Sequence, residues 1–596
     1  MTTGADNVAG TASDDTFSAS LVFTADEVVD ATSTLSVADT LAGEGGTGDK
    51  LSVVVTGGDG GDATTFPSGT FSGIETVSIR NVLTSTLTLT IDAGNFAGAT
   101  TLDSNLSAGI NTFTNIATGS VGSITGNGTF TNGASNFGMV AGATAQTLNI
   151  EDGVTAGAVV LTGADVTTTT VNSTGVANTT GAITTAATTT ATTITATTDL
   201  TTTGAFSAGA SEAITIASTG DVTLASLATT GTAANLTISG AGATTVTAAL
   251  DAGITTVSAG TAQGAVTLTG SAIATVATTL GLGDDSYTTG ATLGTGSVDA
   301  GDGTDTLILG TNVGHANTTT LAAKYTNFEV LSVNGTFVGS LISNVDAIIL
   351  SGSTNSVTGL SATQAAAITA SADIGATTLA LTTATGTSDV LSLTMGTGLT
   401  TSAATNAAAL TVTGFETVNI AANAGTTATA GANKTTTIAS FGTPTTLANV
   451  NLTGTAVAIT AADTTVATTF DASALTGDGD TTVLGLTISG TTFADGSTVT
   501  GSDFVDNVTL DAGTEGVTLN LGAGNDLMTA NIASLVADGA NDGLFNGGDG
   551  TDKITITNTT GNTLIDNHFT KLSNMETIAL SNTGAGDIDI TTGSAY

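Results

Sequence analysis

A glycine-aspartate motif that returns along the chain constrains the fold more than any other feature of the sequence. The fullest copy runs from Gly547 to Ile554 and reads G-G-x-G-x-D-x followed by a large apolar residue. Copies that end at Asp285, Asp305 and Asp526 lack only the first glycine. The glycines let the backbone take positive φ values and turn its carbonyl groups toward a centre. The apolar residue then begins a short strand whose side chain enters a core.

The oxygens of this motif point to a metal. Carboxylate and carbonyl oxygens are the ligands that Ca²⁺ prefers, so we expect calcium as a cofactor that the protein needs in order to fold or assemble. The alternative for each aspartate is that it only closes its turn by accepting backbone hydrogen bonds; we favour the ligand interpretation. The predicted metal ligands and their glycines are Asp15, Asp49, Gly57, Asp59, Asp62, Gly281, Gly283, Asp285, Gly301, Asp302, Gly303, Asp305, Gly522, Gly524, Asp526, Asp542, Gly548, Asp549, Gly550 and Asp552.

The charge of the chain narrows its possible partners. It has 6 Lys and Arg residues against 49 Asp and Glu residues, a formal net charge of −43. So few cations cannot neutralise phosphates, which excludes nucleic acid as an expected partner and argues against bare anionic lipid. Divalent cations would relieve the repulsion within such a chain. Because there is no cysteine, no disulfide framework holds the fold.

The residues needed for common enzymatic chemistry are missing from the sequence. There are only two histidines, His315 and His568, and no cysteine. We find no G-x-S-x-G elbow, no H-E-x-x-H helix and no P-loop. Aromatic residues make up 4% of the chain, too few for a sugar or base platform. We therefore expect a protein that is not an enzyme.

A longer module contains the motif. An aspartate and an alternating strand are followed by a second alternating strand that begins at a glutamate, and each half reads as a half-buried strand. The glutamate is either a calcium ligand or a structural residue that accepts the hydrogen bonds of a turn or a strand start; we favour the structural role. The four pairs, which have similar intervals in sequence, are Asp49 and Glu75, Asp305 and Glu329, Asp389 and Glu416, and Asp552 and Glu576.

These patterns predict an all-β, multi-domain fold, a parallel β-helix or β-roll solenoid with calcium-binding loops. The interval between Asp542 and Asp552 is close to the nine-residue period of a calcium β-roll, and the interval between Asp285 and Asp305 would then hold two coils. The Thr- and Ala-rich stretch 179–203 is either a stacked threonine ladder or a poorly ordered loop. Residues 360–367 are a helix candidate.

Changes in composition divide the chain into four segments. Residues 1–98 form a β segment with the calcium motif. Residues 99–280 form a repetitive Thr/Ala/Gly β-helix, in which acidic residues become sparse. Residues 281–440 form a pair of the longer modules, and residues 441–596 form a C-terminal β segment with calcium loops.

The motifs together resemble RTX-type calcium-binding bacterial surface-layer proteins. The resemblance rests on the stretches 2–17, 39–51 with 71–77, 386–391 with 414–420, and 470–475. The chain also resembles the lattice-forming part of the Caulobacter surface-layer protein. The resemblance implies a structural protein that assembles with itself into a calcium-dependent lattice on the outside of a Gram-negative cell. We expect no counterpart of that protein's helical lipopolysaccharide-binding domain in this sequence. Anchoring would then involve another surface of the chain, a partner such as lipopolysaccharide or an anchoring protein, or a segment outside this sequence.

The same resemblance implies export by type I secretion, because the family uses an uncleaved C-terminal signal. The first residues lack the basic and apolar regions of a Sec signal peptide. No run of 18 apolar residues predicts a transmembrane helix. The alternative function is an RTX adhesin or extracellular fibre, and a third is the RTX tail of a secreted enzyme.

Overall fold

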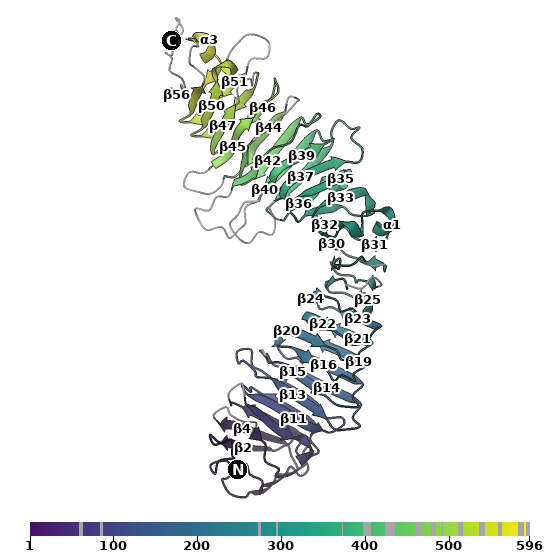
Figure 1. The fold of residues 1–596 in the computed structure, drawn as a ribbon. Helices are drawn as coiled ribbons and strands as arrows, with labels where there is room; N and C mark the ends of the chain where they lie inside the picture. The colour runs from purple at the N-terminus through teal and green to yellow at the C-terminus, as the bar shows by residue number, and fades with distance from the viewer. Residues whose placement is uncertain are drawn as a thin grey trace. The chain divides into compact units, whose positions relative to one another are not determined.

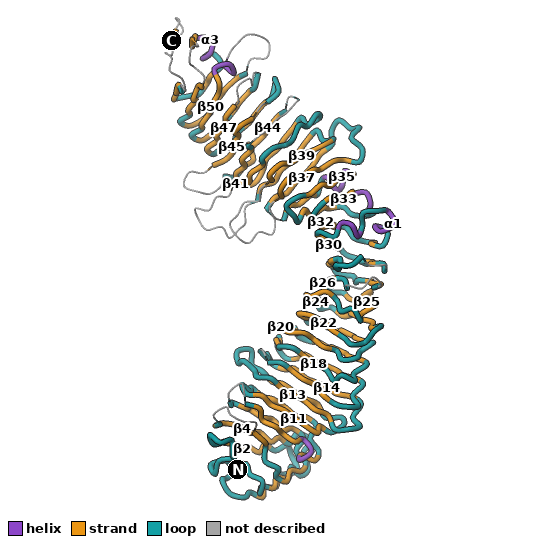
Figure 2. The backbone as a smooth tube through the Cα atoms, in the orientation of Figure 1, coloured by secondary structure: helices purple, strands orange, loops and turns teal. Residues whose placement is uncertain are grey.

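The computed structural model is a parallel β-solenoid with little helix (Figures 1 and 2). It confirms the all-β class. The structure describes the chain except for residues 59–63, 84–86, 156, 272–275, 294–295, 372–373, 397–406, 424–434, 461–465, 467, 478–483, 492, 511–515, 536–542, 558–562, 582–588 and 592–596. The helices among the described residues are α1 (Thr319–Ala322), α2 (Ala362–Ala365), α3 (Asp566–Phe569), and the 3₁₀ turns η1 (Ala93–Asn95), η2 (Val313–His315), η3 (Gly339–Leu341) and η4 (Ile532–Leu535).

The chain divides into two compact units. The first holds residues 1–305 and 324–327, and the second holds residues 306–323 and 328–596. The four segments expected from composition stay a prediction. Within each unit, successive strands alternate mainly between two long parallel sheets, so that one strand of each sheet makes one coil.

Sheet 1 of the first unit contains β2 (Thr16–Phe23), β4 (Lys50–Gly57), β7 (Thr76–Asn81), β10 (Thr101–Asn105), β12 (Val121–Thr125), β14 (Ala145–Glu151), β16 (Thr168–Thr174), β19 (Ala191–Ala196), β21 (Ala213–Ser218), β23 (Ala234–Gly240), β25 (Ile254–Ala262), β27 (Ala277–Thr279), β29 (Val298–Asp299) and β31 (Tyr325–Thr326). Sheet 2 of that unit contains β5 (Thr64–Thr65), β8 (Thr88–Asp92), β11 (Ile110–Ile116), β13 (Ser135–Met139), β15 (Val159–Thr162), β17 (Asn178–Thr180), β18 (Ile183–Thr184), β20 (Leu200–Ser207), β22 (Val222–Ala228), β24 (Thr244–Ala249), β26 (Val266–Thr269) and β28 (Ser286–Thr288). A small third sheet holds β1 (Asn7–Ala9), β3 (Thr40–Ala42), β6 (Thr70–Ser72) and β9 (Phe96–Ala97).

Sheet 3, in the second unit, contains β33 (Thr336–Val338), β35 (Asn355–Leu360), β37 (Ile374–Leu381), β39 (Ala407–Thr413), β41 (Thr435–Ile438), β43 (Ala456–Ile459), β45 (Leu484–Thr491), β47 (Val505–Leu510), β50 (Leu527–Asn531), β53 (Lys553–Thr557) and β56 (Thr577–Leu580). Sheet 4 contains β30 (Thr306–Gly310), β32 (Val330–Val333), β34 (Ala347–Leu350), β36 (Ile368–Ala370), β38 (Val390–Met395), β40 (Thr417–Ala422), β42 (Asn449–Gly454), β44 (Thr469–Leu475), β46 (Thr498–Thr500), β48 (Thr518–Asn520), β51 (Leu544–Asn546) and β55 (Leu572–Ser573). Two short ladders pair β49 (Ala523–Gly524) with β52 (Asp549–Gly550) and β54 (Thr563–Ile565) with β57 (Asp589–Thr591).

Alternating side chains build the core. In β4, Leu51, Val53 and Val55 are fully buried while the residues between them face outward. Successive side chains of a strand point to opposite faces, so every coil presents its apolar side to the inside. In neighbouring coils, side chains of the same kind stack on each other. The rings of Phe113 and Phe137, for example, lie 5.3 Å apart and nearly parallel.

The predicted module is one step of the solenoid. Its two strands are neighbours in one sheet, so that Lys50 pairs with Thr76 and Lys553 pairs with Thr577. The predicted nine-residue period, with two coils between Asp285 and Asp305, is wrong. Asp285 and Asp305 lie in adjacent coils, with the Asp285 N–H donating to Asp305 Oδ1 at 2.6 Å, so the interval between them makes one coil and not two.

The Thr- and Ala-rich stretch is an ordered part of the first unit. It forms β17, β18, β19 and the start of β20. Buried hydroxyl groups bridge its coils: the hydroxyl oxygens of Thr169 and Thr189 are 3.0 Å apart, and those of Thr192 and Ser211 are 2.8 Å apart. Of the two alternatives, the threonine ladder is therefore confirmed.

In this part of the solenoid the coils have a constant length. Thr193, Thr215 and Thr237 pair in register on sheet 1, so successive steps along the column are equal. On sheet 2, Thr201 and Thr223 pair with the same step. The columns face outward, because the residues that alternate with them, such as Ile194 and Ile216, are buried.

The first strand of sheet 1 does not present a free edge. Residues 24–36 fold back along β2: the Thr34 N–H donates to Ser20 O at 2.9 Å, and the Val22 N–H donates to Ser33 Oγ at 2.9 Å. Edge strands invite pairing with other chains, and this segment blocks such pairing at β2.

The helix candidate at 360–367 is a single turn. Leu360 still belongs to β35, and α2 covers only 362–365. Ser361 caps it, since its hydroxyl accepts the Gln364 N–H and the Gln364 side chain accepts the Ser361 N–H. This reciprocal capping box stabilises a helix start, and the next strand, β36, begins at Ile368.

Candidate metal centre

Four acidic side chains stack at one corner of the second unit. The N–H of Leu486 donates to Asp506 Oδ1, and the Asp506 N–H donates to Asp526 Oδ1 at 2.8 Å. The Asp526 N–H then donates to Asp552 Oδ1 at 2.8 Å, and the Asp552 N–H donates to Glu576 Oε2 at 2.7 Å. Each carboxylate thus ties its own coil to the coil before it. We call this arrangement the carboxylate ladder.

The first unit contains the same arrangement twice. The Asp15 N–H donates to Asp49 Oδ1 at 2.6 Å, and the Asp49 N–H donates to Glu75 Oε2 at 2.8 Å. Asp285 and Asp305 form the second ladder. The structure therefore brings aspartates of the strong motifs together in adjacent coils, through backbone amides that the sequence did not indicate.

The structure shows three of the four module glutamates in the structural role. Their Oε2 atoms accept the N–H of the aspartate one coil earlier, from Asp49 to Glu75, from Asp389 to Glu416 and from Asp552 to Glu576, at 2.7–2.8 Å. A residue with positive φ stands two positions before each glutamate, namely Gly73, Gly414 and Asn574. The pattern Gly or Asn, apolar residue, Glu is the sequence signal for this role.

The second carboxylate oxygen divides the aspartates into two classes. In Asp285 and Asp506, Oδ2 accepts an N–H of the same loop, from Gly281 at 2.6 Å and from Ser502 at 2.7 Å; Asp15 does the same with Thr11. In the other class Oδ2 is buried and has no hydrogen-bond partner among the described residues. The members of this class are Asp49, Asp389, Asp526 and Asp552.

Burial makes the charged form of these carboxylates costly. Asp506 and Asp526 are fully buried. Burial raises the pKa of Asp506 to about 6 and, together with the nearby Asp506 and Asp552 carboxylates, that of Asp526 to about 8. A buried ionised carboxylate needs a compensating charge. A hard cation fits this need at the unpartnered Oδ2 atoms.

The glycines of the motif let the loops stack backbone on backbone. A Cβ at Gly548 would lie 1.8 Å from Gly522 O, and one at Gly550 would lie 1.5 Å from Gly524 O. Both glycines have positive φ, +102° and +150°. A Cβ at Gly547 would lie 2.7 Å from Asp552 Oδ2. Only glycine leaves this space beside the carboxylate.

The first unit builds its loop in the same way. A Cβ at Gly301 would lie 2.2 Å from Gly281 O, and one at Gly303 would lie 2.5 Å from Gly283 O. The Asp302 N–H donates to Gly281 O at 3.1 Å, just as the Asp549 N–H donates to Gly522 O at 2.9 Å in the second unit. The side chains of Asp302 and Asp549 are exposed.

Several predicted site residues take no part in a described ladder, among them Asp302 and Asp549, whose side chains are exposed. Gly57 ends β4 and packs against the carbonyl of Phe23. Asp59, Asp62 and Asp542 lie outside the described residues.

A second set of contacts was not predicted. The residue before the motif aspartate reaches in the opposite direction: Asp284 Oδ1 accepts the Thr304 N–H at 2.8 Å, and Asn525 Oδ1 accepts the Thr551 N–H at 2.9 Å. Adjacent loops are thus clasped from both sides. An Asp or Asn directly before the motif aspartate is the sequence signal that could have predicted these contacts.

No group of three or more Asp, Glu, His or Cys side chains is placed to hold a metal ion within the described part of the chain. An ion at Asp526 or Asp552 would therefore take most of its ligands from backbone carbonyls of the loops. Ca²⁺ accepts such mixed oxygen sets readily.

The two histidines have ordinary surroundings. Burial lowers the pKa of both His315 and His568. His568 Nδ1 accepts the Ile565 N–H at 3.1 Å at the start of α3, which is a structural contact.

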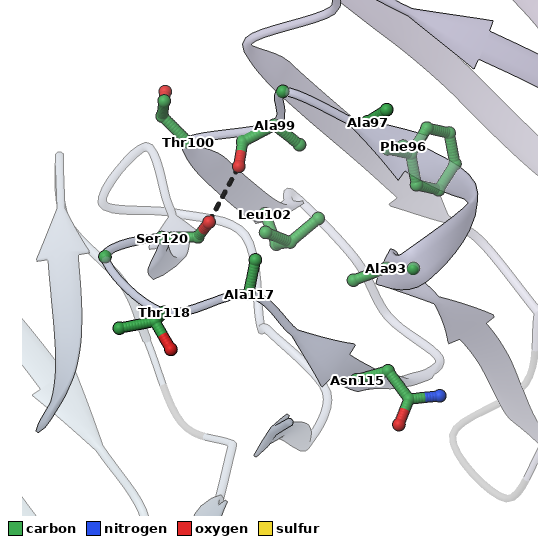
Figure 3. A pocket seen from close by; sticks show the side chains of 13 residues that line it. Ala93, Phe96, Ala97, Ala99, Thr100, Leu102, Asn115, Ala117, Thr118 and Ser120 are labelled. Carbon is green, nitrogen blue, oxygen red and sulfur yellow. Dashed lines mark hydrogen bonds between the residues drawn. The ribbon is translucent and has the colours of Figure 1, made fainter. Parts of the chain in front are cut away.

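A pocket of about 410 Å³ lies in the first unit, at the corner formed by η1 and β9 (Figure 3). Phe96, Leu102 and Ala117 line it together with Asn115 and Ser120, whose Oγ donates to Ala99 O at 2.7 Å. Its lining contains no ionisable side chain. The pocket offers hydroxyl, amide and apolar groups, which suit a neutral molecule better than an ion.

Neither protein-family models nor curated proteins provide a match to this chain. Within the described residues, no helix is long and apolar enough to cross a membrane.

Proposed function

We propose that this protein is a structural, non-enzymatic component of an extracellular lattice, and that calcium bound at the solenoid corners holds it in its assembling form. The observation that carries the proposal is the set of buried Oδ2 atoms at Asp49, Asp526 and Asp552, which lie in glycine loops and have no hydrogen-bond partner in the described part of the chain. In a chain of charge −43, each bound calcium would also reduce the repulsion between coils and between copies.

The proposal also includes where the protein is found and how its copies assemble. The resemblance to RTX-type surface-layer proteins supports a place at the cell surface, reached by type I secretion, in a lattice of identical copies. An RTX adhesin or extracellular fibre is the second candidate. The uniform coils between β19 and β23 favour it in one respect, because they would make a regular spacer.

Calcium removal is the first test. Purified protein in millimolar Ca²⁺ is expected to form ordered two-dimensional arrays, since extracellular calcium modules bind with Kd values of about 10⁻⁴–10⁻³ M. Excess EGTA is expected to disperse them, because the buried carboxylates lose their counter-ion. Electron microscopy and light scattering measure both states. Arrays that persist unchanged in EGTA would refute the calcium role, and filaments in place of sheets would favour the fibre.

Magnesium is expected to replace calcium poorly. Mg²⁺ requires a tight octahedron and gives up its water reluctantly, whereas stacked loops offer carbonyl oxygens in a wider arrangement. Titration of assembly with each ion should give a midpoint at least about tenfold higher for Mg²⁺. Equal midpoints would indicate general charge screening and not a shaped site.

A further inference from the structure

The strands β4 and β7 carry a concentration of positive charge that is unusual for this chain. Lys50 and Arg80 are two of only six basic residues in the sequence. The strands pair in register, with Val54 opposite Arg80. Leu51 and Ile79 are buried, so by alternation Lys50, Val54 and Arg80 share the outer face of sheet 1. From strand geometry the Cα atoms of Lys50 and Arg80 are about 14 Å apart.

The two basic side chains are not neutralised by ion pairs with the described residues of the first unit. Neither Lys50 nor Arg80 forms an ion pair with a described residue. The nearby acid is Asp103 on β10, which accepts hydrogen bonds from Ser78 Oγ at 2.8 Å and Thr125 Oγ1 at 2.9 Å. Asp103 is buried beside the patch, with its carboxylate engaged by these hydroxyls.

Apolar side chains complete the patch. Val54 is 39% exposed and Val82, two residues after Arg80, is 40% exposed. A valine pair beside two cations suits a protein surface that has both apolar and acidic groups. A polyanionic glycan would use only the cations.

We propose that the patch formed by Lys50, Val54, Arg80 and Val82 docks an acidic surface of a second copy of this chain. The charge complementarity is strong, because each copy has 49 acidic residues. The patch cannot pair with itself, since that would bring cations together. The contact is therefore between different surfaces of the two copies, the kind that propagates into rings or open arrays. The inference rests on the proposed lattice and names one of its contacts.

The test compares two variants that change the net charge equally. Arg80→Gln removes one positive charge in the patch, and Thr223→Glu adds one negative charge at an outward, half-buried position on sheet 2. At fixed calcium, the protein concentration at half-assembly, measured by light scattering, is expected to rise roughly fivefold to twentyfold for Arg80→Gln and by less than about twofold for Thr223→Glu. Arg80→Lys should behave almost like the wild type, and circular dichroism checks folding.

A second measurement identifies the partner directly. Carbodiimide joins an amine to a carboxylate that touches it, so assembled mixtures of ¹⁴N- and ¹⁵N-labelled protein should give mixed-label cross-links from Lys50. Equal half-assembly concentrations for both variants, or Lys50 cross-links within single copies only, would overturn the docking proposal while leaving the lattice standing. A wild type that never assembles in calcium would overturn both. The protein could also bind an anionic polysaccharide. If Arg80→Gln abolishes that binding and leaves assembly unchanged, the patch binds a glycan and is not a contact between copies.

Discussion

Gly548→Ala is expected to disrupt the stacking of the C-terminal coils. The new Cβ would lie 1.8 Å from Gly522 O, where neither group is a flexible side-chain end, and φ is +102°. The left-handed conformation alone costs alanine about 1 kcal/mol, and the backbone clash should bring the total to about 3–5 kcal/mol. Hydrogen exchange of β50 and β53 measures the loss locally, which matters because a chain with two units does not unfold in one step.

A glycine in the same unit separates the two costs. Gly310 also has positive φ, +53°, but nothing lies within 4 Å of a Cβ there. Gly310→Ala should therefore cost only the conformational term, about 1 kcal/mol. If the two variants lose similar protection, backbone contact between stacked loops is not what fixes glycine at position 548.

Asp552→Asn is expected to have opposite effects with and without calcium. The amide oxygen can still accept the Asp526 N–H. The buried Oδ2, which has no partner among the residues that the structure describes, is replaced by a neutral group. In EGTA the variant should be more stable than the wild type by about 1–2 kcal/mol, because a buried charge is gone. At a calcium concentration about one hundred times Kd, it should lack the roughly 2.7 kcal/mol that one bound ion supplies.

Asp506→Asn is the matched control. Both oxygens of Asp506 already accept N–H groups, from Leu486 and Ser502. An amide would place a donor against a donor, so this variant should be less stable in both conditions. Isothermal titration counts the calcium sites, and hydrogen exchange gives the local stability. Wild-type affinity and stoichiometry in Asp552→Asn would show that the aspartate serves the carboxylate ladder alone.

The alternating strands and the glycine-rich corners were sufficient to predict the parallel solenoid. The length of a coil was not predictable from the motif, because the glycine-aspartate loop marks only one corner. Other corners use different chemistry. The buried Asn178, for example, accepts the N–H groups of Gly153 and Val154, both at 2.9 Å, and has no motif around it.

The sequence identified the motif aspartates as candidates for the site but could not tell them apart. Asp285 and Asp552 occupy the same motif position, yet Oδ2 accepts an N–H of its own loop in the first and has no partner among the described residues in the second. That difference depends on the local direction of one amide, Gly281 N–H in the case of Asp285. The direction of a single backbone amide cannot be predicted from residue identity at the motif position.

The constant coils between β19 and β23 give this protein a length that can change only in discrete steps. Removing one whole coil would place Thr215 where Thr193 now stands and would preserve the register of sheet 1. Removing one residue fewer than a coil would turn the apolar side chains of the next strands outward. Each coil adds about 4.8 Å along the solenoid. Duplication or loss of whole coils would therefore change the length of the solenoid in fixed steps, while its corners and ends stay as they are.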